Sequence, residues 1–238
     1  MIGVVIPAHN EAHRLASCLS SVLAAARHPA LAHEPVQVMV VLDSCRDGSA
    51  RIATGFGVAT LVVHARNVGV ARAAGADRLL EAGARWLAFT DADTRVAPDW
   101  LAAQLALGAD AVCGTVSIDD WRGHPASVRE HWRRTYRDTE GHRHVHGANL
   151  GVSAQAYRRA GGFPPLACSE DVMLVDLLAA TGASIAWSAT PRVVTSARRD
   201  PRARGGFGDT LGAWARVPLR SADEAEPDGL AGVAPVAS

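Results

Sequence analysis

The segment Trp86-Leu87-Ala88-Phe89-Thr90-Asp91-Ala92-Asp93 is an apolar run that leads directly into two carboxylates. The first half of the segment is apolar on both faces, which is typical of a buried strand. Two carboxylates separated by one residue on a turning loop can share a hard divalent cation, and that cation can bridge phosphate oxygens. Aspartates in such positions also form solvated turns or helix caps. The segments on either side help to decide between these interpretations.

Outward from this segment, apolar runs alternate with helical patterns along the first half of the chain. Strands are predicted at Ile2–Ile6, Val36–Leu42, Val58–Val63 and Trp86–Thr90, with a helix carrying Leu15 and Leu19 and further helices from about Asp47, about Gly69 and Pro98. Strands that are apolar on both faces and alternate with helices form a mostly parallel sheet that is covered on both sides. The sequence therefore predicts an α/β fold, a three-layer α/β/α sandwich.

The second half of the chain is less regular. Predicted there are a strand near Ala111–Ile118, helices over Ser127–Arg137 and Glu170–Thr181, and strands at Ile185–Trp187 and Val193–Thr195. We expect one domain over residues 1–218, with a nucleotide-binding half of about 1–118 and an acceptor half of about 119–218. Residues 219–238 are expected to form a disordered tail, because the end of the chain becomes acidic and then rich in Gly, Pro, Ala and Ser.

Charge and composition exclude several classes of function. Among 238 residues, 24 basic side chains balance 24 acidic ones, so no global field draws the chain to nucleic acid. Every basic residue is arginine, which excludes mechanisms that need a lysine. The four cysteines are scattered and match reduced thiols in a cytoplasm. No apolar run approaches the ~20 residues that span a bilayer, so we expect a cytoplasmic protein with room for peripheral binding at the inner face of the membrane.

Several motifs follow one another in a fixed order around the carboxylates. They are Val4-Val5-Ile6-Pro7-Ala8-His9-Asn10-Glu11, Val41-Leu42-Asp43-Ser44-Cys45-Arg46-Asp47-Gly48-Ser49, Asn67-Val68-Gly69-Val70-Ala71-Arg72, Asp91-Ala92-Asp93, Gly147-Ala148-Asn149-Leu150-Gly151, Gly161-Gly162-Phe163 and Ser169-Glu170-Asp171. Over about residues 2 to 198 this succession resembles family 2 glycosyltransferases. The resemblance implies the GT-A fold and inverting transfer of a sugar from a nucleoside-diphosphate sugar to a hydroxyl acceptor, with Mn²⁺ or Mg²⁺ as cofactor.

The resemblance also implies roles for residues on the donor side. Those residues are Pro7, His9, Glu11 and Asp43 for the nucleoside, Arg72 for the diphosphate, Asp91 for the ribose and the metal, and Asp93 for the metal. Arg72 and the nearby Asp47 also have structural interpretations. Arg72 could be a solvated surface arginine, and Asp47 could cap the next helix. The stretch from Asp43 to Asp47 is less acidic than is usual in the family, which leaves the base of the nucleotide open.

On the acceptor side, the resemblance implies that Asp171 is the general base. Glu170 beside it is interpreted as an acid favoured in the first turn of a helix. His146, Gly147 and Asn149 are further acceptor-side candidates. His142, His144 and His146 alternate, so on a strand they would share one face and could bind a metal or line the acceptor pocket. Alternatively, these three histidines are partly exposed surface residues.

The segment from Thr195 to Arg199 resembles a C-terminal segment of some bacterial family members. Arg198 and Arg199 could form a lid over the diphosphate, or belong to a basic surface loop. A nucleotidyltransferase and an inactive sugar-nucleotide binding module remain the competing functions. A haloacid-dehalogenase-type phosphatase would need a lysine, and a dinucleotide-dependent oxidoreductase would need a Gly-x-Gly-x-x-Gly motif after the first strand. The sugar, the base and the acceptor, whether lipid, glycan or small metabolite, stay open.

Overall fold

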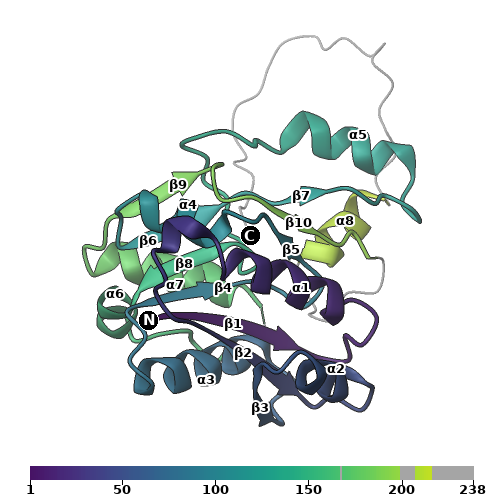
Figure 1. The fold of residues 1–238 in the computed structure, drawn as a ribbon. Helices are drawn as coiled ribbons and strands as arrows, with labels where there is room; N and C mark the ends of the chain where they lie inside the picture. The colour runs from purple at the N-terminus through teal and green to yellow at the C-terminus, as the bar shows by residue number, and fades with distance from the viewer. Residues whose placement is uncertain (167, 199–206, 216–238) are drawn as a thin grey trace.

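A computed structural model describes residues 1–166, 168–198 and 207–215. Its main element is a seven-stranded sheet in the order β3-β2-β1-β4-β8-β6-β9 (Figure 1). The strands are β1 (Ile2–Ala8), β2 (Val36–Asp43), β3 (Ala59–Val63), β4 (Trp86–Phe89), β6 (Ala111–Gly114), β8 (Leu150–Ser153) and β9 (Ile185–Ser188). In this sheet β8 runs antiparallel to β4 and β6, and the other pairings are parallel. The mostly parallel α/β sheet predicted from the sequence is confirmed.

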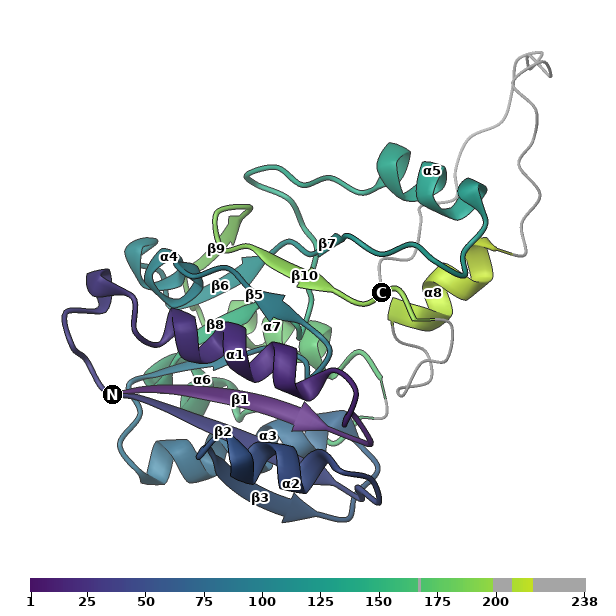
Figure 2. The same cartoon turned by 45° about the vertical axis from the view of Figure 1, so that its right-hand side comes forward.

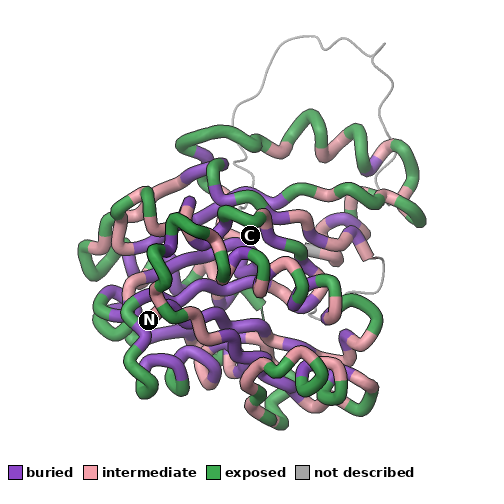
Figure 3. The backbone as a smooth tube through the Cα atoms, viewed as in Figure 1, coloured by how far each residue is buried: buried purple, intermediate pink, exposed green. Residues whose placement is uncertain are grey.

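Helices cover both faces of this sheet, because successive side chains of each strand point to opposite sides. Val4 and Val40 pack with the helices of one face, which are α1 (Leu15–Ala25), α2 (Ser49–Gly55) and α4 (Trp100–Ala106). Val5 and Val41 pack with the helices of the other face, which are α3 (Val68–Glu81), α6 (Ala154–Ala160) and α7 (Glu170–Ala180). The strands are therefore buried at the centre of three layers, as Figure 3 shows by colour.

A second, smaller sheet extends the molecule at one end. Its strands are β5 (Arg95–Val96), β10 (Val193–Thr195) and β7 (Ser117–Ile118), in that order. Beside it, α5 (Ala126–Thr135) and α8 (Phe207–Trp214) pack together through Val128 and Leu211. Figures 1 and 2 show α5 set apart from the layered part of the molecule. No helix in the described part of the chain is both long and apolar enough to cross a bilayer.

Several local predictions need correction. The single strand predicted near Ala111–Ile118 is wrong, because the chain leaves the main sheet after Gly114 and pairs with β10 from Ser117. The Val116 N–H there donates to the Tyr136 hydroxyl at 2.7 Å instead of to a neighbouring strand. The second and fourth helices begin later than predicted, at Ser49 and Trp100. The short η1 helix (Pro29–Leu31), β5, β8, α6 and α8 were not predicted, and the predicted tail 219–238 lies outside the described residues.

Candidate active site

Loops at the carboxyl ends of β1, β2 and β4 bring the predicted donor-side residues to one edge of the sheet, where ligands bind in open α/β sheets. The backbone there takes an unusual conformation. Asn10, Ser44 and Arg66 have φ angles of 55°, 53° and 49°, and Ser169 at the start of α7 has 58°. Residues other than glycine rarely adopt this left-handed region, at a cost of about 1–3 kcal/mol each, and such residues cluster at functional sites.

The loops after β1 and β2 are joined by hydrogen bonds. His9 Nδ1–H donates to the carbonyl oxygen of Asp43 at 2.7 Å. Asp47 accepts from the backbone N–H of Ala12 at 2.9 Å and of Ser49 at 3.0 Å, so its carboxylate also satisfies the first turn of α2. The N-cap of α2 is Gly48, so Asp47 lies one residue before the cap position and accepts from the first residue of the helix. His9 and Glu11 are held against the second strand's loop as one rigid rim.

Asp43 is 4% exposed and its carboxylate orders a third loop. Its Oδ1 accepts from the N–H groups of Ala65 and Arg66 at 2.9 and 2.8 Å, and its Oδ2 accepts from Asn67 N–H at 2.8 Å. Burial on its own would raise the pKa of Asp43, but these donors and the Ser44 hydroxyl lower it below its usual range. The side chain therefore stays ionised and fixes the approach to α3.

The Asp91 carboxylate is connected to α7 through Arg72. Arg72 is 4% exposed, which rules out the solvated-surface interpretation. Its guanidinium donates to Asp91 Oδ1 at 2.6 Å and to Glu170, and lies over the Phe163 ring. Burial alone would lower the pKa of Arg72, but the carboxylates of Asp91, Glu170 and Asp171 raise it, so the cation persists in the interior. Glu170 is thus more than a helix-start acid, because it is buried as the partner of this arginine.

Asp171 lies beside this pair, at the loop that precedes β8. Its Oδ2 accepts from the backbone N–H of Gly147 at 2.7 Å, and its Oδ1 accepts from Val172 N–H at 2.9 Å. Asn149 in the same loop is fully buried, and its amide contacts Trp100, Thr115 and Pro191. Asn149 therefore supports the loop from inside the protein, whereas Asp171 keeps a partly exposed carboxylate next to Gly147.

The Asp93 carboxylate meets a different arginine, from the far end of the described chain. Arg198 Nε donates to Asp93 Oδ2 at 3.0 Å, and its Nη1 donates to Glu11 Oε1 at 2.6 Å. Its Nη2 also pairs with Asp93. Desolvation raises the pKa of Asp93, although Arg198 acts in the opposite sense. Arg198 is therefore no simple surface residue, while Arg199 lies outside the described residues.

The three alternating histidines stack in series and do not converge on a point. They lie in an extended loop outside any strand, with ring centroids 5.5 Å apart for His142 and His144 and 5.9 Å apart for His144 and His146. His146 is bonded to the Tyr136 hydroxyl at 3.1 Å. Burial, followed by the charges of His144 and His142, lowers the pKa of His146 to about 3, so it is neutral at physiological pH.

This arrangement can be compared with known proteins. Residues 3–160 match the family described as "Glycosyl transferase family 2". The chain belongs to glycosyl transferase family 2. The matched range contains both Asp91 and Asp93 but ends before Glu170, Asp171 and Arg198. No match was found among curated proteins.

Solved structures of glycosyltransferases share the fold of this family 2 member. The 1–349 fragment of S. aureus TarS, in complex with UDP-GlcNAc, aligns with a TM-score of 0.64 at 16% identity, over 87% of this chain and 61% of the fragment. The mannosyltransferase PcManGT from Pyrobaculum calidifontis, with GDP-Man and Mn²⁺, gives 0.58 at 19%, over 90% and 68%. Glucosyl-3-phosphoglycerate synthase from Mycobacterium tuberculosis, with Mn²⁺, UDP and glucosyl-3-phosphoglycerate, gives 0.57 at 19%, over 91% and 76%. This chain spans about three fifths of the TarS 1–349 fragment.

The residues of this site fit a divalent metal whose coordination is completed by phosphate oxygens of a ligand. Among the described residues, no group of three or more His, Cys, Asp or Glu side chains could hold a metal by itself. One or two carboxylates are nevertheless what Mg²⁺ uses when phosphate oxygens complete its coordination. The cation that Asp93 already contacts is the Arg198 guanidinium, which shows that this carboxylate sits where positive charge is stabilised.

Several residues of this family 2 site were missed by sequence reasoning. Arg198 and Glu11 were both predicted as site residues, but the hydrogen bond between them joins positions 187 residues apart, and no local pattern predicts it. Tyr136 was also missed; it follows the last residue of α5, and its ring stacks on that of Trp132 with the centroids 3.8 Å apart. The half-buried Trp121 and the exposed Arg129 of α5 belong to no motif, and only the fold brings them into the same cavity wall as Asp93.

Proposed function

We propose that this chain is an inverting glycosyltransferase that moves a sugar from a nucleoside-diphosphate sugar to a hydroxyl acceptor, and that residues 1–218 form its single transferase domain. The observation that carries the proposal is the link from Asp91 through the buried Arg72 to Glu170, next to Asp171. A carboxylate suited to the donor and a carboxylate suited to an acceptor hydroxyl are thereby held in one rigid cluster. The complexes of TarS with UDP-GlcNAc and of PcManGT with GDP-Man support a nucleotide-sugar donor.

Residues at the first two strand ends would bind the donor. Pro7, His9 and Glu11 line the rim for the nucleoside, and Asp43 supports that rim through its hydrogen bonds to residues 65–67. Asp91 and Asp93 would hold Mn²⁺ or Mg²⁺, which as a Lewis acid stabilises the departing diphosphate when bound. The Mn²⁺ complexes of PcManGT and of the phosphoglycerate synthase support this cofactor class.

Asp171 would act on the acceptor. Its carboxylate takes the proton of the acceptor hydroxyl while that oxygen forms a bond to the anomeric carbon. The bond from this carbon to the diphosphate breaks on the opposite face, so the configuration inverts. General-base catalysis of this kind contributes about 10²–10⁴-fold. His146, neutral and bonded to Tyr136, would line the acceptor side together with Gly147.

The experiment is to incubate the full chain with Mn²⁺ and a panel of nucleotide sugars, and to measure the nucleoside diphosphate released. We expect release with one donor class, its loss on chelation and its recovery with Mn²⁺ or Mg²⁺. Release of pyrophosphate from a nucleoside triphosphate would identify a nucleotidyltransferase instead. Donor binding without any turnover, over a broad panel of acceptors, would identify a binding module.

A further inference from the structure

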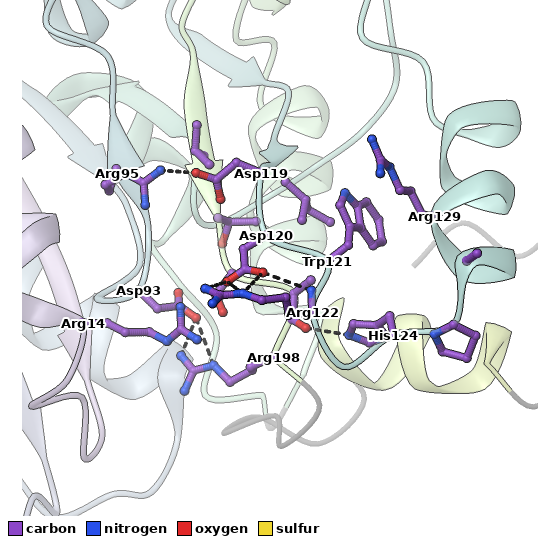
Figure 4. Close-up of a pocket in the computed structure, with 17 residues that line it drawn as sticks. Arg14, Asp93, Arg95, Asp119, Asp120, Trp121, Arg122, His124, Arg129 and Arg198 are labelled. Atoms are coloured by element: carbon purple, nitrogen blue, oxygen red, sulfur yellow. Dashed lines mark hydrogen bonds and ion pairs between the residues drawn. The ribbon is translucent and has the colours of Figure 1, made fainter.

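A cavity of about 1060 Å³ opens beside Asp93. Its wall comes from the start of α1, the ends of β7 and β10, and the first turn of α5 (Figure 4). None of His9, Asp43 and Asp91 lines it. The cavity therefore adjoins the proposed donor site at Asp93 but is distinct from the part that would hold the nucleoside.

Positive charge is in excess on this wall. The lining contains five arginines, Arg14, Arg95, Arg122, Arg129 and Arg198, and three aspartates, Asp93, Asp119 and Asp120. Each aspartate is paired with one arginine. Within the described residues, Arg14 and Arg129 form no ion pair with a carboxylate. Arg14 is nevertheless close enough to Asp93 and Asp120 to act on the pKa of both carboxyls in the lowering direction, so Arg129 is the guanidinium that no carboxylate of the wall engages.

Two of the existing pairs can also exchange partners at little cost. The Arg122 side chain is 91% exposed and that of Arg95 is 47% exposed, with Asp120 and Asp119 as their respective partners. Solvent-exposed pairs of this kind contribute little to stability, because water already screens them. A guanidinium that gives up such a carboxylate for a ligand phosphate keeps an equivalent bidentate partner.

The shape of the cavity indicates a small ligand with an apolar or ring-like part. Trp121 lies on the wall between the central Arg122 and Arg129 of α5, while Arg14 and Arg198 lie at the opposite end beside Asp93 (Figure 4). An indole can pack against the ring of a sugar or another flat group. The volume is at the upper end of what small-molecule sites enclose, which fits a metabolite or a short glycan.

We propose that this cavity binds an anionic group, a phosphate or a carboxylate, of the acceptor. The inference rests on the proposed function and names the chemistry of its second substrate. Asp171 does not line the cavity, so the cavity holds a part of the acceptor away from the reacting hydroxyl. Arg129 supplies the uncommitted charge, Arg14 adds a second guanidinium beside Asp93, and Trp121 supplies the packing surface.

The first test measures the binding of inorganic phosphate to the full chain, by calorimetry and without donor. We expect Arg129→Gln and Arg14→Gln each to weaken phosphate binding roughly tenfold, as expected for loss of a charge-assisted contact. The matched control is Arg134→Gln, which removes an exposed arginine of the same helix that does not line the cavity. Equal binding by wild type and Arg129→Gln, or equal weakening by Arg134→Gln, would overturn the proposal.

Two further arms separate the sources of the anion. UDP with Mg²⁺ is added to the phosphate complex, and phosphate should stay bound; its displacement would assign the cavity to the donor's diphosphate and overturn the proposal. Transfer is then compared between glycerol and glycerol 3-phosphate as probes, and the anionic probe should be preferred in wild type but not in Arg129→Gln. If no nucleotide sugar is turned over while phosphate binding still depends on Arg129, the proposed transferase function fails and the anion site stands.

Discussion

Asp91 and Asp93 are separated by a single residue, yet their carboxylates meet different arginines. Asp91 pairs with Arg72 of α3, and Asp93 pairs with Arg198 near the end of the described chain. The buried Ala92 between them turns the loop so that the two side chains lead in different directions. At the scale of single residues, the loop therefore connects two charge clusters, one toward Asp171 and one toward the arginine-lined cavity.

Asp43→Asn is expected to lower the free energy of unfolding by about 1–3 kcal/mol, because a buried hydrogen-bond network loses its charge. In the unmutated protein, three backbone N–H groups donate to this carboxylate. Since the pKa of Asp43 is lowered in the folded state, its contribution is present above the unfolded pKa of about 4 and is lost as the pH falls. Urea unfolding at pH 7 and at pH 3 measures the difference.

The control for Asp43→Asn is Asp77→Asn, which removes an exposed carboxylate of α3. A control variant as unstable as Asp43→Asn would show that charge alone, and not the bonding to residues 65–67, causes the loss. Nucleotide affinity, measured on the folded protein by calorimetry, should also fall for Asp43→Asn. Unchanged affinity would restrict Asp43 to a structural role.

Asp171→Asn is expected to lower turnover by about 10²-fold or more, because an amide cannot take up the acceptor's proton. The amide oxygen can still accept from Gly147 N–H, so the loop should keep its position. Donor affinity should barely change. Turnover is measured at saturating donor, and near-normal turnover would leave Glu170 and His146 as the next candidates for the base.

At the scale of elements, the sequence predicted the first half of the fold because β1, β2 and β4 are largely buried on both faces and a helical pattern follows each strand. The strands β1, β2, β3 and β4 lie within a few residues of their predicted bounds. The sequence did not predict β5 and β7 as separate strands, because a strand of two residues is too short to show a periodic pattern. Both strands form by pairing with β10. Local signals thus fail where the partner strand is distant in sequence.

The site residues also divide into those whose position the local sequence predicts and those whose position depends on distant segments. Asp91, Asp93 and Asp43 follow strands directly, so their place at one edge of the sheet could be predicted from the topology. The burial of Arg72 could not, because it depends on the approach of α7, whose Glu170 is 98 residues away. Asn149 is the opposite case. It lies in a motif that predicted a site residue, but its side-chain amide forms hydrogen bonds inside the protein.

Gly147→Ala tests the contact between the loop before β8 and α3. A Cβ at this position would overlap the Arg72 guanidinium, which has little room to move because it is buried. We expect turnover to fall about 10²-fold through displacement of Arg72 and its partners, with a stability loss of about 1–3 kcal/mol. Gly55→Ala is the control, because no atom lies within 4 Å of its added Cβ. Normal turnover in Gly147→Ala would show that Arg72 can shift without consequence.

At the scale of the whole molecule, Arg198 joins distant parts of the described sequence at the Asp91-Ala92-Asp93 loop. Its guanidinium contacts Asp93 and Glu11, although these lie 105 and 187 residues away. The side chain is only 19% exposed, so the contact is more than a solvated surface pair. Without substrate, Arg198 thus occupies a carboxylate that the proposed metal requires.

Arg198→Gln is therefore expected to affect the metal and the donor in opposite directions. Without nucleotide, Mn²⁺ should bind about tenfold more tightly, because it no longer displaces a charge-assisted pair from Asp93. The nucleoside diphosphate with Mn²⁺ should bind more weakly, because the variant lacks a cation to meet the diphosphate. Electron paramagnetic resonance of free Mn²⁺ measures the first affinity and calorimetry the second, with the exposed Arg78→Gln as control. If Mn²⁺ affinity without nucleotide is the same in both variants and wild type, Arg198 does not compete with the metal, and its contact with Asp93 serves only to fasten the C-terminal segment to the sheet.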